Sequence, residues 1–461
     1  MRRFLFFILV VLSVGIGWVA LYGKKSFTSQ SSLSMNVPLM NETSVTLKEI
    51  HTPAGYQIWL APADIPVVTV GVAFLGAGQR CSFKTPGLVE LLVSLLDEGA
   101  GPYNSQAFKT RLLEKNIQLS INANQDNIVI TLRTIKSNVK DALELLQLML
   151  TAPRFDEDDM VRVKQQMVSN LEQSLHYPEV VGREALQRFM LDEDHPYRPD
   201  TLARIKNIPA ITREQLCHYM EQNFTKQSVR VVAAGDISLS ELTDCVDKTF
   251  ASLKPGELQP NGFEAKFRNL GQTLTIDMDV PQSVIYFAQP SLSRHHPDFY
   301  AFFVVNRILG NAFESRLWHE VREKRGLAYF CSTGLSTADL ANTLTGVTAT
   351  KTETVQQTIQ IIKQEWQRLV DHGIDARELE FHKKNTTGAY ALNFGSTIEI
   401  VNILLGYCQQ GLAIDAVNQR NKMIQKLTVE DMNRVIQHYL KPNDLIFVRV
   451  GRPVSEPSSK P

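Results

Sequence analysis

Apolar residues follow two different periods in the first part of this chain, and these periods predict strands and helices. Runs of apolar residues at 57–61 and 67–74, separated by Pro62 and Pro66, predict two β-strands. Helical spacing of leucines at 88–96, followed by Gly99, predicts a helix, and 106–114 predicts another. Further strands are expected at 118–124, 127–133 and 229–235, and further helices at 139–150, 156–175, 211–223 and 239–251.

The second part of the chain contains the same kinds of element again. Strands are predicted at 283–288 and 343–348, and helices at 299–309, 354–370 and 376–386. Residues 211–235 can be matched to residues 427–451 at a constant offset of 216, which indicates a duplicated domain rather than a short repeat. The pattern therefore predicts two related α+β domains at 42–253 and 267–451, with a Pro- and Gly-rich linker at 254–266 and a disordered tail at 452–461.

The composition is that of an ordinary globular protein. Hydrophobic residues make up 44% of the chain and charged residues 21%, which is far from the composition of disordered proteins. Lys and Arg together number 48, and so do Asp and Glu, so the balance of charge does not favour a nucleic-acid partner.

The amino terminus differs from the rest. Residues 4–22 carry no charge and lie between Arg2-Arg3 and Lys24-Lys25, and a helix of this length would extend roughly 28 Å, enough to cross a bilayer. We expect residues 1–25 to be an uncleaved membrane anchor and 26–41 a flexible tether, which would place the protein in a bacterial inner membrane with its soluble part in the periplasm. The alternative is a cleaved signal peptide and secretion to the periplasm.

The segment that begins at Gly87-Leu88 resembles the zinc-binding helix of the pitrilysin-like (M16, inverted zinc-motif) metallopeptidases, whose pattern is Gly-Leu-x-His-x-x-Glu-His. On that pattern Glu90 and Ser94 stand at the two histidine positions, and Val93 stands at the position of the general base. The family's third ligand, a Glu about 75 residues further on, corresponds to Asn170. Valine cannot accept a proton and serine is a poor zinc ligand, so we expect no zinc or other cofactor in this chain.

A second resemblance covers residues 315–329, Ser-Arg-Leu-Trp-His-Glu-Val-Arg-Glu-Lys-Arg-Gly-Leu-Ala-Tyr. In the M16 family an Arg and a Tyr seven residues apart in this motif bind the substrate peptide and help to stabilise the scissile carbonyl. Here they are Arg322 and Tyr329, whose guanidinium and phenol are suitable donors for that role. The alternative makes Arg322 one of several charges on a solvated helix face and Tyr329 a core aromatic.

The resemblance spans roughly residues 45–451 and implies two homologous domains, each an antiparallel sheet covered by helices, that form a clam-shell chamber. It also implies a function. We expect a non-catalytic, substrate-binding subunit of a heterodimeric metalloendopeptidase, paired with a zinc-bearing M16 subunit and binding an unfolded or extended peptide. The alternatives are a peptide-binding or scaffold protein without proteolysis, and a self-sufficient peptidase with unrecognised ligands.

Overall fold

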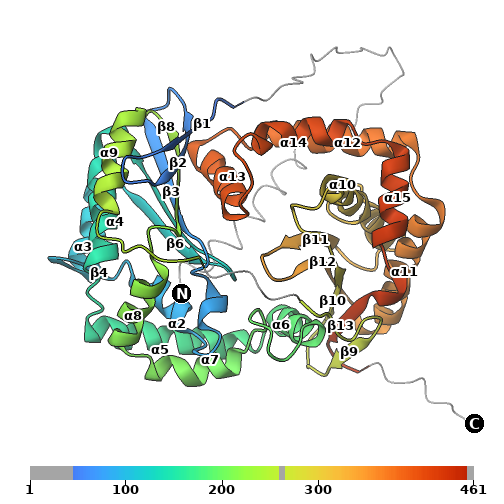
Figure 1. Ribbon diagram of the computed structural model, residues 1–461. Coiled ribbons are helices and arrows are strands. Elements are labelled where there is room, and N and C mark those ends of the chain that lie inside the picture. The colour runs from blue at the N-terminus through green and yellow to red at the C-terminus, as the bar shows by residue number, and fades with distance from the viewer. Residues whose placement is uncertain (1–44, 259–264, 454–461) are drawn as a thin grey trace, which may run out of the picture. The chain divides into compact units, whose positions relative to one another are not determined.

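The computed structural model describes residues 45–258 and 265–453, and the first half of the chain forms a six-stranded sheet (Figure 1). The strand order is β1-β2-β8-β3-β7-β6, and the pairing is antiparallel except between β2 and β8, which are parallel. Its strands are β1 (Lys48–His51), β2 (Gln57–Pro62), β3 (Val67–Phe74), β6 (Gln118–Ala123), β7 (Ile128–Ile135) and β8 (Val229–Gly235). A two-stranded ribbon, β4 (Gly99–Ala100) and β5 (Tyr103–Asn104), lies outside this sheet.

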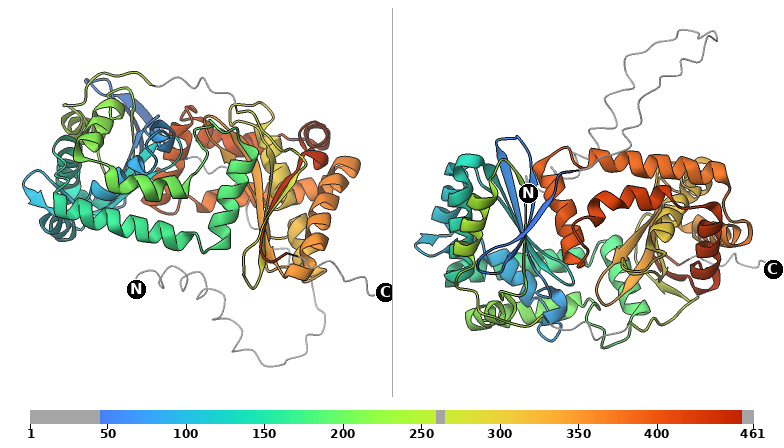
Figure 2. Two further views of the ribbon diagram at one scale, coloured as in Figure 1. Left: turned by 90° about the horizontal axis from the view of Figure 1, so that it is seen from below. Right: turned by 45° about the horizontal axis from the view of Figure 1, so that its top comes forward.

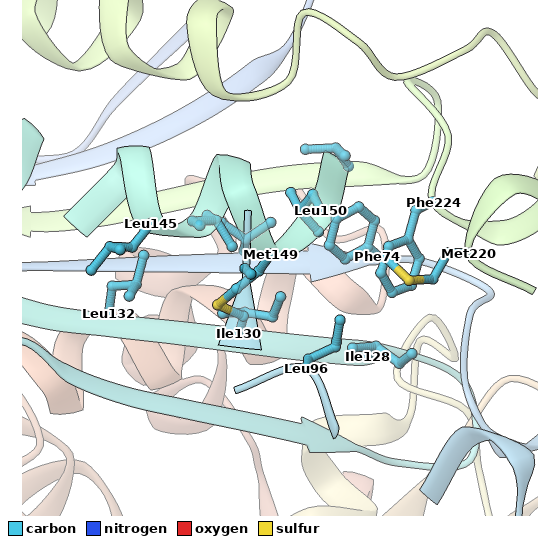
Figure 3. Packing of buried hydrophobic residues seen from close by; sticks show 14 of the residues in the cluster. Phe74, Leu96, Ile128, Ile130, Leu132, Leu145, Met149, Leu150, Met220 and Phe224 are labelled. Atoms are coloured by element: carbon cyan, nitrogen blue, oxygen red, sulfur yellow. The ribbon is translucent and has the colours of Figure 1, made fainter. Parts of the chain in front are cut away.

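One face of the first sheet packs against helices from the same half. Val70, Val72 and Phe74 alternate along β3 and belong to a buried cluster with residues of the covering helices. Figure 3 shows Phe74 in this cluster, near Leu150 and Phe224. The helices of the first half are α2 (Leu88–Leu95), α3 (Ser105–Glu114), α4 (Val139–Thr151), α5 (Glu157–Ser174), α6 (Pro178–Met190), α7 (Thr201–Asn207), α8 (Arg213–Asn223) and α9 (Leu239–Thr249).

The second half forms a five-stranded sheet with the order β11-β12-β10-β13-β9, again antiparallel except for one parallel pair, β9 with β13. Its core includes Phe287, Phe302 and Trp366, which come from a strand and two helices. The strands are β9 (Thr273–Ile276), β10 (Ser283–Pro290), β11 (Cys331–Thr337), β12 (Asn342–Thr350) and β13 (Ile446–Val450). The helices are α10 (Phe299–Leu309), α11 (Val355–His372), α12 (Ala376–Leu392), α13 (Thr397–Gln409), α14 (Ala416–Gln425) and α15 (Val429–Tyr439).

The two halves exchange one helix each, so that both sheets are covered on two faces (Figures 1 and 2). Helix α13 of the second half packs on β3 and β8, where Val401 and Leu404 join a buried cluster with Ala73. Helix α6 of the first half packs on β10 and β13 through Leu186 and Met190. The exchange explains why β3 is apolar at nearly every position, because a strand buried on both faces does not alternate. The described residues accordingly form one compact unit.

The duplication predicted from the sequence is confirmed by the positions of the elements. β10 begins at Ser283, 216 residues after Val67 begins β3, and both strands have 8 residues. α8 and α15 are related by the same offset and both have 11 residues. The two halves are therefore copies of one α+β arrangement.

Most of the predicted elements are also confirmed within a few residues. The strand at 67–74 coincides with β3, and the helix at 88–96 ends one residue earlier than predicted, at Leu95. The sequence pattern did not predict helices α6, α7, α13 and α14 or strands β1, β4, β5, β9 and β11. The predicted linker falls between α9 and β9.

The predicted anchor at 4–22, the tether at 26–41, part of the linker and nearly all of the tail lie outside the described residues. Within 45–258 and 265–453, no single helix is long and apolar enough to cross a membrane. Helices α12 and α13 pass that test only as a pair, with a bend of 119° between them.

Candidate functional site

Helix α2 carries the positions that the zinc motif would occupy. It begins after Gly87, whose φ of 93° lies in the left-handed region and whose missing side chain leaves room for Ile208. One side of the helix is buried in the first core through residues that include Leu91 and Leu92. The same helix packs against α5, the helix that carries Asn170.

Glu90, at the first ligand position, is paired with an arginine from another helix. Arg204 of α7 places Nη1 3.6 Å from Glu90 Oε1 and Nη2 2.6 Å from Glu184 Oε1 of α6. The Thr201 hydroxyl also donates a hydrogen bond to Glu184. Because arginine keeps its positive charge, the first ligand position faces a fixed cation that would repel a metal ion.

The other three positions offer no metal ligands. Val93 packs against the first core, and the Ser94 hydroxyl donates to the Glu90 carbonyl oxygen at 2.8 Å. Asn170 is exposed, and its Oδ1 accepts a hydrogen bond from Gln166 Nε2 at 2.9 Å. Zinc prefers thiolate, imidazole and carboxylate ligands, so these residues do not fit the ion that the resemblance implies for an intact motif. Across the residues that the structure describes, no group of three or more His, Cys, Asp or Glu could hold a metal ion.

The second motif contains a π-helical turn, Trp318–Glu323. The Lys324 N–H donates to the His319 carbonyl oxygen at 2.9 Å, which is the wider i to i+5 spacing of a π-helix. Leu317 and Val321 anchor the turn in the second core. Such turns are rare and occur frequently at functional sites.

Arg322 points outward from this turn. Its guanidinium lies over the Trp318 ring at 5.4 Å from the centroid, and the ring of Phe313 lies 4.6 Å from the same indole. Arg322 is exposed, and the structure gives it no carboxylate partner among the described residues. Its donors are therefore held in place by an aromatic ring while they remain available to a ligand.

Tyr329 lies two residues before β11 and is 84% exposed, so the alternative of a core aromatic is wrong. The strand that follows is an edge strand, since β11 pairs only with β12 among the described residues. An edge strand presents unpaired N–H and C=O groups to which an extended peptide can add.

A buried polar network that the sequence did not reveal joins the two halves. Asp126, in the turn between β6 and β7, accepts from the Tyr197 hydroxyl and from the Asp339 backbone N–H, the latter at 3.1 Å. Arg80 Nη1 lies 3.4 Å from Asp126, and its Nη2 lies 3.2 Å from Asp339 in the turn between β11 and β12. Burial and the neighbouring Asp126 raise the pKa of Tyr197, which keeps the hydroxyl protonated as a donor. This network fixes the far end of β11 to the first half.

Two helix-exchanging α+β halves, with a peptidase-type helix that lacks its ligands, define a metallopeptidase-like protein. The family described as "Peptidase M16 inactive domain" matches residues 210–386. A non-peptidase homolog, YmxG of Helicobacter pylori, is 24% identical over 414 residues, which cover 89% of this chain and 95% of that protein. The probable mitochondrial-processing peptidase subunit beta of Schizosaccharomyces pombe is 26% identical over 256 residues, covering 54% of this chain and 55% of that protein.

The fold is also found among solved structures. The crystal structure of a peptidase M16 inactive domain from Pseudomonas fluorescens superposes with a TM-score of 0.83 at 23% identity, covering 89% of this chain and 99% of that one. The chain is similar to proteins of the M16 peptidase family over most of its length, and it lacks the zinc-binding motif. It is a zinc-protease-like homologue of the inactive type, with the α+β fold of that family.

Proposed function

We propose that this chain is the peptide-binding, zinc-free subunit of a heterodimeric M16 metalloendopeptidase. Its partner is an M16 chain with an intact His-x-x-Glu-His motif, and in this proposal the zinc belongs to that partner. The substrate is an unfolded or extended peptide. This chain contributes Arg322 and Tyr329 to the shared site.

The observation that carries the proposal is the state of Arg322. Arg322 is exposed on a π-helical turn, lies over the Trp318 ring and has no carboxylate partner among the described residues, so its donors stay available to a ligand. The exposed phenol of Tyr329 follows on the same segment, at the start of an edge strand. A folding role explains neither side chain, since both are exposed.

The chemistry follows from the donors. Arg322 donates to carbonyl oxygens of the peptide, whose backbone extends as an added strand along β11. Tyr329 donates to the scissile carbonyl oxygen as negative charge develops on it, which stabilises the transition state more than the bound substrate. Neither residue takes up or releases a proton in this scheme.

Pairing with a second M16 chain is supported by the incomplete site and by a relative named as a subunit of a peptidase. The rival proposal is a peptide-binding or scaffold protein that takes part in no proteolysis. Self-sufficient proteolysis with other ligands is not favoured, because no suitable ligand group exists among the described residues.

The test is reconstitution of the full chain with the zinc-bearing partner and an assay on an unstructured peptide. Arg322→Ala and Tyr329→Phe should each lower turnover by about 10²–10³, the usual effect of losing one oxyanion-type donor. Arg377→Ala and Tyr177→Phe are matched controls, since Arg377 is exposed without an ion pair among the described residues and Tyr177 is 48% exposed.

The outcomes separate the two proposals. Turnover within about twofold of wild type for both Arg322→Ala and Tyr329→Phe would overturn the subunit proposal, because neutral surface changes have effects of that size. If the complex with the zinc-bearing partner shows no turnover, and Arg322→Ala and Tyr329→Phe weaken peptide binding, the scaffold proposal would be favoured. Thermal melts of all four variants should be unchanged, since none of the side chains is buried.

We also propose that residues 4–22 anchor the chain in a bacterial inner membrane with the soluble part in the periplasm. The support is the uncharged run of nineteen residues between basic flanks. Amino-terminal sequencing of the mature protein that begins near Lys24 would instead show a cleaved signal peptide. Release of the protein from membranes by high salt would also contradict the anchor.

A further inference from the structure

Three side chains that precede Tyr329 in the sequence form a continuous stack on the surface: Phe313, Trp318 and Arg322, here called the aromatic stack. Phe313 is 72% exposed and its ring meets Trp318 at a centroid distance of 4.6 Å with an interplanar angle of 45°. Arg322 covers the same indole at 5.4 Å. Two aromatic rings and a guanidinium are thus in contact outside the core.

Phe313 contributes little to folding, because most of its surface stays in water. Its neighbour Glu314 has a φ of 65°, in the left-handed region that residues other than glycine rarely adopt. A strained residue persists where the surrounding structure imposes it, and such residues gather at ligand-binding sites. The fold therefore tolerates a strained turn that presents the ring of Phe313 to solvent.

Charge on and next to the π-helical turn indicates what the stack binds. Glu320 is paired with Lys324 and Arg325, and His319 lies 2.8 Å from Glu323. Among the charged side chains of the π-helical turn Trp318–Glu323 in the described part of the chain, Arg322 alone lacks an ionic partner. A ligand that brings an oxygen acceptor to Arg322 and an apolar group to Phe313 would complement both exposed side chains. An extended peptide with a large apolar side chain next to a carbonyl group offers both.

We propose that the aromatic stack determines which peptides this chain binds, by receiving a large apolar side chain, aromatic or aliphatic, beside the carbonyl held by Arg322. Phe313 provides the apolar contact. Trp318 is a positioning residue, because its indole supports both Phe313 and the guanidinium. The inference rests on the proposed peptide-binding function of Arg322 and Tyr329 and adds the class of peptide.

The experiment measures fluorescence anisotropy of labelled, unstructured peptides binding to the full chain. Three peptides have the same length and charge and differ only at one central residue, which is Phe, Leu or Ala. Wild type should bind the Phe and Leu peptides roughly tenfold more tightly than the Ala peptide, the effect expected of one interface hot spot. Phe313→Ala should reduce this ratio to about twofold or less and leave binding of the Ala peptide nearly unchanged.

The chain offers two matched controls. Leu113 and Leu392 are 78% and 77% exposed, so Leu113→Ala and Leu392→Ala remove an equally exposed apolar side chain elsewhere. Both should keep the wild-type ratio between the peptides. Trp318→Phe should weaken all three peptides less than Trp318→Leu, because a smaller ring still supports the guanidinium.

The possible failures are distinguishable. A Phe313→Ala variant that keeps the wild-type ratio would overturn the role of the stack, while a uniform loss of affinity in Arg322→Ala would leave the proposed function standing. Peptides that bind equally well to wild type, Arg322→Ala and Tyr329→Phe, or that do not bind at all, would overturn both. Phe313→Leu keeps an apolar side chain, so its preference for the Phe and Leu peptides over the Ala peptide should lie between those of wild type and Phe313→Ala. This variant tests the same proposal if Phe313→Ala folds poorly.

Discussion

Replacing Gly71 with alanine should destabilise the protein, because the added methyl group would enter the contact between β3 and the exchanged helix α13. A Cβ atom at Gly71 would lie 2.7 Å from Leu405 Cδ1, 2.7 Å from Val401 Cγ1 and 3.0 Å from Val232 Cγ2. All three neighbours are buried, so none can turn out into solvent.

The size of the effect follows from the packing. Carbon atoms prefer separations of about 3.5–4.0 Å, so the side chains of Leu405 and Val401 must each shift by roughly 1 Å. Overpacking of this kind costs about 1–3 kcal/mol in a closely packed interior. Urea unfolding of Gly71→Ala, followed by far-UV circular dichroism, should show a loss in this range with an unchanged dependence on urea.

Gly406, on α13 itself, is the matched control. Nothing lies within 4 Å of its Cβ position. Alanine is favoured over glycine inside a helix by about 0.5–1 kcal/mol, so Gly406→Ala should stabilise the protein where Gly71→Ala destabilises it. Combining Gly71→Ala with Leu405→Ala should recover part of the summed loss, because the truncated side chain leaves room for the new methyl group. A neutral Gly71→Ala, or strict additivity in the double variant, would refute this account of the α13–β3 contact.

Two further variants test buried polar groups. The Tyr197 hydroxyl donates a hydrogen bond to Asp126 and accepts one from the Leu340 backbone N–H at 2.9 Å. Tyr197→Phe removes both and should lower the free energy of unfolding in urea by about 1–3 kcal/mol. An unchanged urea midpoint would contradict this. Burial holds the pKa of His382 at about 4, below the ordinary value of about 6.5. The unfolded chain therefore binds a proton in that interval that the folded chain does not, so stability falls as pH drops from about 6.5 toward 4. In His382→Leu the loss of stability between pH 7 and pH 4.5 should be smaller than in wild type by about 2–3 kcal/mol. The measurement is urea unfolding of both proteins at the two pH values. An identical loss of stability in both proteins would disprove this prediction.

Local patterns were sufficient to predict most of the strands and most of the helices that pack within their own half. The strand at 67–74 and the repeat at an offset of 216 are examples, because the residues that determine them lie within one element or within matching copies. Helices α6 and α13 were missed, although each has an apolar face. The sheet that buries the apolar face of each helix belongs to the other half, so the sequence near the helix gave no sign of that packing.

In the candidate site, too, some features could be predicted from the sequence and others depend on tertiary packing. Glu90, Val93 and Ser94 could be placed from the motif alone, because a helix fixes the spacing of its own positions. Arg204 beside Glu90 could not, since the two residues meet only through the packing of α7 near α2. The Phe313–Trp318 contact and the π-helical turn were also beyond a sequence pattern, because they depend on how the second core holds that turn.

Helix α2 shows why this fold persists without the zinc-binding motif. Residues such as Leu91 and Leu92 are buried, and a buried leucine contributes about 1.5–3 kcal/mol through the hydrophobic effect, whatever stands at the ligand positions. The ligand positions are only partly buried, so they could change without loss of the core. In the second half, Leu317 and Val321 anchor the turn that carries Arg322 in the same way. Packing and chemistry are thus carried by different faces of the same elements, so the fold by itself does not specify activity. The residues through which this chain would act are those that folding does not need, Arg322 and Tyr329.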